Sequence, residues 1–155
     1  MAKQHLTIGW REWIGLPDLG VDYIKAKIDT GARTSALHVN HIEVLEEREK
    51  DTLLRVRIHP VQRSRKEEIT AEVFAHDQRT VKSSAGHQQH RYVIETNLKA
   101  GERIFPIEIS LTNRDAMGFR MLLGRTALRK DFLINPKKSY LLGKPDFARR
   151  KGTDR

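Results

Sequence analysis

The chain has 155 residues, of which 38% are hydrophobic, 6% aromatic and 32% charged, with a formal net charge of +9 and no cysteine. This length suits one domain with a hydrophobic core, and the lack of cysteine excludes disulfides and thiolate zinc sites and favours a reducing compartment. With no apolar run of about 18 residues and no apolar leader, the sequence predicts no membrane span and a cytoplasmic location.

Short strands account for most of the patterned segments. Their apolar positions alternate with polar ones or form short runs rich in β-branched and aromatic residues. In chain order, strands are predicted at residues 25–28, 53–58, 69–74, 91–96, 103–111, 121–124, 132–135 and 139–142. Many short strands separated by turns indicate an all-β barrel or sandwich.

Three of the connecting segments carry signals of their own. Residues 97–102 predict a hairpin turn in which Gly101 supplies the permissive backbone. Residues 126–132 predict a short helix, with Thr126 as its N-cap. The small, polar residues 82–90 form either an ordinary loop or a mobile flap over a site, since lids use residues that tolerate backbone change.

The most informative segment is Ala26-Lys-Ile-Asp-Thr-Gly-Ala-Arg-Thr-Ser35. An apolar strand ends there in Asp29, Thr30 and Gly31. The glycine permits a tight turn, the threonine hydroxyl can hold the loop, and the aspartate is left at the turn. An Asp-Thr-Gly triplet alone suits an ordinary loop or a helix N-cap equally well.

A second segment, Arg120-Met-Leu-Leu-Gly-Arg-Thr126, stands far downstream. With both segments the chain resembles the retropepsins, whose pattern is an apolar strand, Asp-Thr-Gly-Ala, a flap hairpin, and two apolar residues with Gly-Arg before a short helix. It is similar in particular to a bacterial retropepsin-like family that is associated with the ribosomal-modification ligase RimK and has been labelled "ATP-dependent zinc protease". The matching phrases are Ile8–Trp13, Lys27–Leu37, Arg91–Ile94 and Met117–Leu128, and the resemblance runs from about Ile8 to Leu142.

The resemblance implies an all-β fold, a retropepsin-like closed barrel with one short C-terminal helix. This domain would occupy residues 1–145 and be followed by a disordered basic tail at residues 146–155. The catalytic residues would be Asp29, Thr30 and Gly31, without a cofactor or a metal ion.

A single Asp-Thr-Gly motif implies a homodimer. Aspartic proteolysis needs two carboxylates that share a proton across a bound water, and this chain has half the length of a two-lobed enzyme. A two-fold axis would bring Asp29 beside its symmetry mate. Thr30 would then brace the two loops, and Gly31 would allow close approach of the substrate backbone.

The resemblance assigns substrate contacts to Ala32, Arg33 and Arg125. Retroviral relatives usually carry an acidic residue at the position of Arg33, where it holds the arginine of the Gly-Arg motif. Either Arg125 therefore pairs elsewhere, or both arginines face the cleft and bind a carboxylate-rich substrate. Arg33 in a surface ion pair is the alternative.

The family context and the basic charge predict an acidic, glutamate-rich peptide as substrate, such as the tail of a glutamylated ribosomal protein. Neither a membrane nor a nucleic acid is expected as partner, since the few aromatic residues do not cluster with arginines. Trp10 and Trp13 are expected as core or interface anchors.

Two other functions stay open. A zinc peptidase would have to use His87 and His90, because the chain has no His-Glu-x-x-His motif; it also has no Gly-rich ATP-binding run. A basic binding module that has the same fold but no activity is the other alternative.

Overall fold

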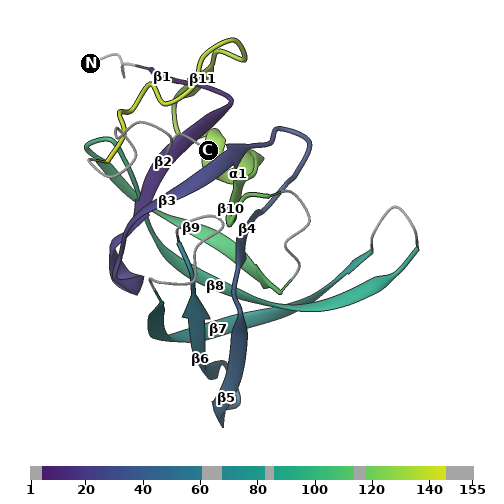
Figure 1. Cartoon of the computed structure of the whole chain (residues 1–155). Helices are drawn as coiled ribbons and strands as arrows, with labels where there is room; N and C mark the ends of the chain where they lie inside the picture. Colours follow the sequence, from purple (N-terminus) through teal and green to yellow (C-terminus); the bar gives the residue numbers. More distant parts are fainter. Residues whose placement is uncertain (1–4, 61–67, 83–85, 114–117, 146–155) are drawn as a thin grey trace.

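The computed structural model describes residues 5–60, 68–82, 86–113 and 118–145, with only the backbone of 81 and 82. The predicted basic tail, residues 146–155, lies outside them. In chain order the elements are β1 (Leu6–Ile8), β2 (Arg11–Leu16), the 3₁₀ helix η1 (Pro17–Leu19), β3 (Val21–Ile28), β4 (Ser35–His38), β5 (His41–Glu47), β6 (Thr52–Ile58), β7 (Ile69–Lys82), β8 (Gln88–Ala100), β9 (Arg103–Thr112), β10 (Met121–Leu123), α1 (Arg125–Leu128) and β11 (Phe132–Ile134). The described part of the chain is thus all-β with one short α-helix, as predicted (Figure 1).

Within the described residues, the sheet is ring-like. Nine strands are hydrogen-bonded in the order β2-β3-β10-β4-β9-β8-β7-β6-β5, and β1 pairs separately with β11. The ring closes because β2 also pairs with β8, where Gly15 lies opposite Lys99. Strands β7, β6 and β5 continue beyond β8 as an antiparallel extension, at the bottom of the view in Figure 1.

One hydrophobic cluster unites the strands of the ring and the extension. Strand β6 illustrates the alternation that fills it, because Leu54, Val56 and Ile58 are all fully buried. The intervening Arg55 points outward and pairs with carboxylates on both neighbouring strands, Glu43 at 3.3 Å and Glu72 at 3.2 Å.

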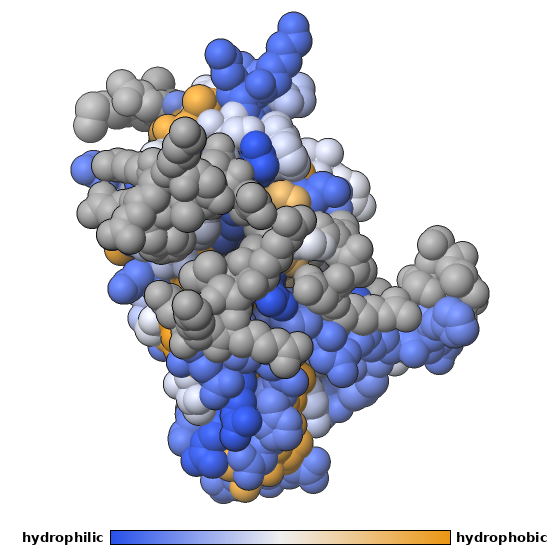
Figure 2. All heavy atoms as spheres, viewed as in Figure 1, coloured by the Kyte–Doolittle hydropathy of each residue, from blue (hydrophilic) through white to orange (hydrophobic). Residues whose placement is uncertain are grey.

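Hydrophilic side chains dominate the face in Figure 2 outside the grey residues. No helix among the described residues has the length and apolar character to cross a membrane.

Most predicted strands coincide with observed ones. Residues 25–28, 53–58, 69–74, 91–96, 103–111, 121–124 and 132–135 fall in β3, β6, β7, β8, β9, β10 and β11, respectively, give or take one terminal residue. The turn between β8 and β9 is shorter than the predicted 97–102, since the strands pair as far as Ala100 and Arg103. Gly101 adopts a left-handed φ of 63° in this turn, the conformation for which glycine was expected.

The predicted helix at 126–132 is wrong in its limits. The observed helix covers only Arg125–Leu128, and its N-cap is Gly124 rather than Thr126. Asp131 has a φ of 66°, which no α-helix can contain, and the chain then enters β11. Backbone geometry after the first turn therefore ends the helix early.

The predicted strand at 139–142 is also wrong, and a buried carboxylate explains why. Glu12 is fully buried, and its carboxylate accepts hydrogen bonds from the N–H groups of Gly9 at 2.6 Å, Leu141 at 2.9 Å and Leu142 at 2.9 Å. A side chain thus satisfies the amides that a strand would have paired. Tyr140, with a φ of 57°, turns the chain immediately before these two leucines.

Both tryptophans take part in aromatic contacts. Trp13 is buried in a small cluster with Tyr140, in agreement with its expected role as a core anchor. Trp10, partly buried, meets the ring of Phe119 edge-on at 6.1 Å.

The predicted flap coincides with the end of the β7–β8 hairpin, which projects from the ring at the right of Figure 1. Gln88 to His90 belong to β8, so the connection is shorter than 82–90, and residues 83–85 lie outside the described part. Arg79 ties the hairpin to β9 through Glu108 at 3.3 Å and also contacts Asp77 at 3.0 Å. The Gln78 N–H and then Arg79 lower the pKa of Asp77 from its ordinary value. Coverage of a cleft by this hairpin stays a prediction.

Replacing Glu12 with alanine is expected to lower the free energy of unfolding by about 3 kcal/mol, because buried amides lose a charged acceptor. Urea denaturation measures this, with Glu47→Ala on the exposed face of β5 as the control, expected within about 0.5 kcal/mol of wild type. Equal losses in the two variants would contradict the proposed role of Glu12.

Candidate active site

Asp29 lies on the loop between β3 and β4, directly after a strand in which Ile24, Lys25 and Ala26 are buried. Its carboxylate Oδ1 accepts a hydrogen bond from the Gly31 N–H at 2.8 Å. A Cβ at residue 31 would come within 3.1 Å of that oxygen, so glycine leaves it room. Asp29 is partly exposed, and Thr30 and Gly31 are exposed. The loop therefore lies at the surface of the described chain, with its carboxylate partly exposed.

Strand β10 supports this loop by lying between the strands that enter and leave it. It pairs in parallel with β3, where Leu123 lies opposite Ile28, and antiparallel with β4, where Leu122 lies opposite Ala36. The Asp29 N–H donates to the Leu123 carbonyl at 2.9 Å. The second sequence motif is thus in direct contact with the first.

Gly124 packs directly against the loop backbone. A Cβ there would lie 2.7 Å from the carbonyl carbon of Thr34 and 2.9 Å from the carbonyl oxygens of Ala32 and Arg33. Such distances exclude any other residue unless the loop moves.

Hydrogen bonds from the Gly-Arg motif fasten the same backbone. The N–H groups of Arg125 and Thr126 donate to the carbonyls of Ala32 at 2.8 Å and Arg33 at 3.0 Å. The Gly124 N–H donates to the Oγ of Ser35, which is fully buried, at 3.1 Å. These bonds fix where the loop turns into β4.

Arg125 finds a partner on the Asp29 loop. Its guanidinium donates to the Thr30 carbonyl at 2.9 Å, in place of the acidic side chain that retroviral relatives supply. Arg33 is exposed, and its main-chain carbonyl rather than its side chain joins the network. Of the alternatives open in the sequence, Arg125 therefore pairs elsewhere, while Arg33 projects from the loop.

A cavity of about 270 Å³ adjoins the loop on the side of β4 and β8. Its walls comprise Ala32, Thr34, Ala36, His38, Arg91, Thr112, Phe119, Arg120, Met121 and Leu122. The sequence reasoning missed this set, although Thr34, Ala36 and His38 follow the Asp-Thr-Gly motif with the period of two that places strand side chains on one face.

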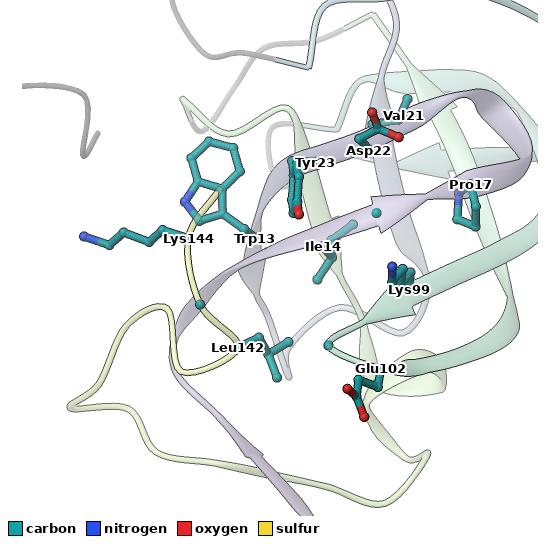
Figure 3. A pocket seen from close by; sticks show the side chains of 13 residues that line it. Trp13, Ile14, Pro17, Val21, Asp22, Tyr23, Lys99, Glu102, Leu142 and Lys144 are labelled. Atoms are coloured by element: carbon teal, nitrogen blue, oxygen red, sulfur yellow. The ribbon is translucent and has the colours of Figure 1, made fainter. Parts of the chain in front are cut away.

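A larger cavity of about 550 Å³ lies elsewhere, between β2, β3, the β8–β9 turn and the segment after Tyr140 (Figure 3). Its charged residues, Asp22, Lys99, Glu102 and Lys144, come from separate segments. None of its lining residues belongs to the Asp29 loop or to β10. The smaller cavity adjoins the Asp29 loop through Ala32, although Asp29 itself is not among its lining residues.

His87 and His90 lie near the end of the β7–β8 hairpin and are exposed. The His90 ring contacts the Gln78 side chain across the hairpin and packs edge-on against Tyr92. In the parts of the chain that the structure describes, no three His, Cys, Asp or Glu side chains group to hold a metal ion. The zinc hypothesis gains no support there.

Comparisons with known proteins identify relatives of two kinds. A family model described as the retropepsin-like aspartic endopeptidase RimB (RimB-like) matches residues 7–145. Proteins named probable alpha-L-glutamate ligase from Shewanella pealeana and Parasynechococcus marenigrum are 42% and 44% identical over 143 and 138 residues, or 92% and 89% of this chain. The chain matches only 31% and 29% of their lengths, so it spans about a third of these curated relatives.

A solved structure shares the fold. The crystal structure of Lpg0085 from Legionella pneumophila, a protein of unknown function, aligns with a TM-score of 0.71 and 26% sequence identity. The alignment covers 88% of this chain and 97% of that one.

Gly124→Ala is expected to displace the Asp29 loop and expose the Arg125 and Thr126 amides, because the added methyl group meets backbone atoms. Amide hydrogen exchange at these two residues measures the effect. Gly86→Ala is the control: its Cβ meets nothing within 4 Å, so only its left-handed φ adds strain. Unchanged exchange in Gly124→Ala would contradict the packing described.

Proposed function

The chain belongs to the RimB-like family of retropepsin-like aspartic endopeptidases, and from this premise we propose that it is an aspartic peptidase whose active form is a homodimer. The single observation that carries the proposal is the Asp29 loop, held from beneath by β10 and Gly124 and open on its outer side. Rigid support with an exposed carboxylate is what a shared catalytic dyad requires.

Two copies of Asp29 would act on one water molecule. Like charges at close range resist simultaneous ionisation, so one carboxyl group keeps its proton while the other is a carboxylate. The carboxylate takes a proton from the water as the water oxygen attacks the scissile carbonyl carbon, and the protonated carboxyl group gives its proton to the carbonyl oxygen. As the tetrahedral intermediate collapses and the C–N bond breaks, the carboxyl group that took the water proton gives it to the leaving amine, and the other carboxylate takes a proton back from a hydroxyl of the intermediate.

The loop residues would divide the supporting work. Thr30 would meet its counterpart in the other copy, while Arg125 holds the Thr30 carbonyl from the side. Gly31 would admit the substrate backbone close to Asp29. Ala32 and Arg33 would border the bound peptide, since they follow the catalytic residues directly.

An acidic, glutamate-rich peptide is the substrate class that we assign. The net charge of +9 attracts such a chain, and Arg33 projects a guanidinium from the loop without a partner among the described residues. The name of the curated relatives is that of glutamate ligases, of which this chain matches about a third. Cleavage of glutamate chains that such ligases make is the activity we assign to the matched region, with a glutamylated ribosomal protein as one such substrate.

Asp29→Asn is expected to reduce peptidase activity at least ~10²–10⁴-fold, because an amide cannot act as the general base. The assay follows cleavage of a glutamate-rich peptide by mass spectrometry, with circular dichroism to check the fold. Asp22→Asn, at an exposed position of β3, is the matched control. Full activity of Asp29→Asn would contradict the mechanism and favour a metal-dependent or non-enzymatic role.

Specific activity is expected to fall on dilution, because each protomer supplies only one carboxylate to the dyad. Light scattering and activity measured over the same concentration range check this. Constant specific activity in samples that are monomeric throughout would contradict a shared site.

A further inference from the structure

The cavity beside the Asp29 loop is basic. Arg91 reaches it from β8, Arg120 from the residue before β10 and His38 from the end of β4. None of the described residues that line it is an aspartate or a glutamate. Three groups of the kind that bind anions therefore face one space whose described walls include no carboxylate.

His38 gives the cavity an unused hydrogen-bonding atom. Its side chain is only 7% exposed, and its Nδ1 has no hydrogen-bond partner among the described residues. A buried polar nitrogen without a partner is costly, and it marks a position that a ligand atom can satisfy. Its backbone is fixed, since the His38 N–H donates to the Arg120 carbonyl at 2.7 Å.

The cavity is part of the same loop and strand as the candidate catalytic group. Ala32 stands three residues after Asp29, and Thr34 and Ala36 continue the wall into β4. A peptide bound across Asp29 would thus pass its side chains over the opening. At about 270 Å³, the cavity is slightly smaller than the ~300–1,000 Å³ of sites for drug-sized ligands, which suits a single side chain.

We propose that this cavity is the subsite that selects a glutamate side chain next to the scissile bond, with Arg91 and His38 as its specificity-determining residues. The proposal rests on the peptidase function proposed above. The Nε of Arg91 donates a hydrogen bond to the Oε1 of Gln89 at 2.9 Å, which orients the guanidinium. Because Arg91 is partly buried, a contact between its guanidinium and a substrate carboxylate would be partly shielded from water. Arg120, which is 8% exposed, contributes positive charge from deeper in the wall.

Arg33 would act differently from this subsite. It is exposed and outside the cavity lining, so its attraction for acidic peptides is screened by salt and not confined to one position of the peptide. The subsite should instead recognise one position and keep its preference at high salt.

A scan of singly substituted peptides tests the subsite. A glutamate-rich peptide and variants with one Glu→Gln change each are cleaved by wild type, Arg91→Gln, His38→Gln, Arg33→Gln and Asp29→Asn. Arg57→Gln, an exposed arginine on β6 outside the cavity, is the matched control. Values of kcat/KM are measured at low and high salt.

Wild type should prefer glutamate at one position near the cleaved bond by about tenfold or more at both salt concentrations, as expected for a hydrogen-bonded charge pair. Arg91→Gln should lose most of this preference and His38→Gln part of it, with the Gln peptide still cleaved. Arg57→Gln should retain it fully, and Arg33→Gln should lower cleavage of all acidic peptides only at low salt.

Three results would overturn the subsite while leaving the peptidase function intact. The ratio of kcat/KM between the Glu and Gln peptides could be unchanged in Arg91→Gln, or Arg91→Gln could lower kcat/KM equally on both peptides. The third such result is a ratio that is lost only in Arg33→Gln. Cleavage by Asp29→Asn at the wild-type rate would instead refute the proposed function itself. The two failures are therefore distinguishable.

Discussion

The contact between Gly124 and the backbone of residues 32–34 is the constraint on which the candidate site depends. No side chain fits there, and the next two amides donate to the same loop. Strand β10 can therefore lie between β3 and β4 and accept the Asp29 N–H. The loop that carries the carboxylate is held by main-chain contacts, which suits the precise placement that the proposed shared dyad needs.

Contacts elsewhere in the fold keep the ring of strands closed around the Asp29 loop and β10. The ring joins where Gly15 pairs with Lys99, and the buried Glu12 ties the segment after Tyr140 to β2 with hydrogen bonds from the main chain. The β7–β8 hairpin is rooted in the ring and projects from it. These contacts lie beneath the Asp29 loop, while Thr30 and Gly31 on its outer side stay exposed.

The sequence predicted the features that rest on local pattern. Alternation in residues 53–58 and the two motifs around Asp29 and Gly124 identified strands, the fold class and the family. It could not predict features set by distant contacts. The failed strand at 139–142 depends on Glu12, more than 120 residues away, which resembled an ordinary charged residue. The basic cavity unites His38, Arg91 and Arg120 from three separate segments, so only the fold reveals it.

The most direct test of a dyad shared between two copies is activity in mixed dimers. Wild type and Asp29→Asn chains are co-expressed or exchanged at known ratios, and cleavage of a glutamate-rich peptide is measured at constant total protein. If each active site needs Asp29 from both protomers, activity follows the square of the wild-type fraction, because mixed dimers are inactive. Once mixed dimers are shown to have formed, a dependence that is linear or curves above linear would mean that one Asp29 suffices for a site and would contradict the account.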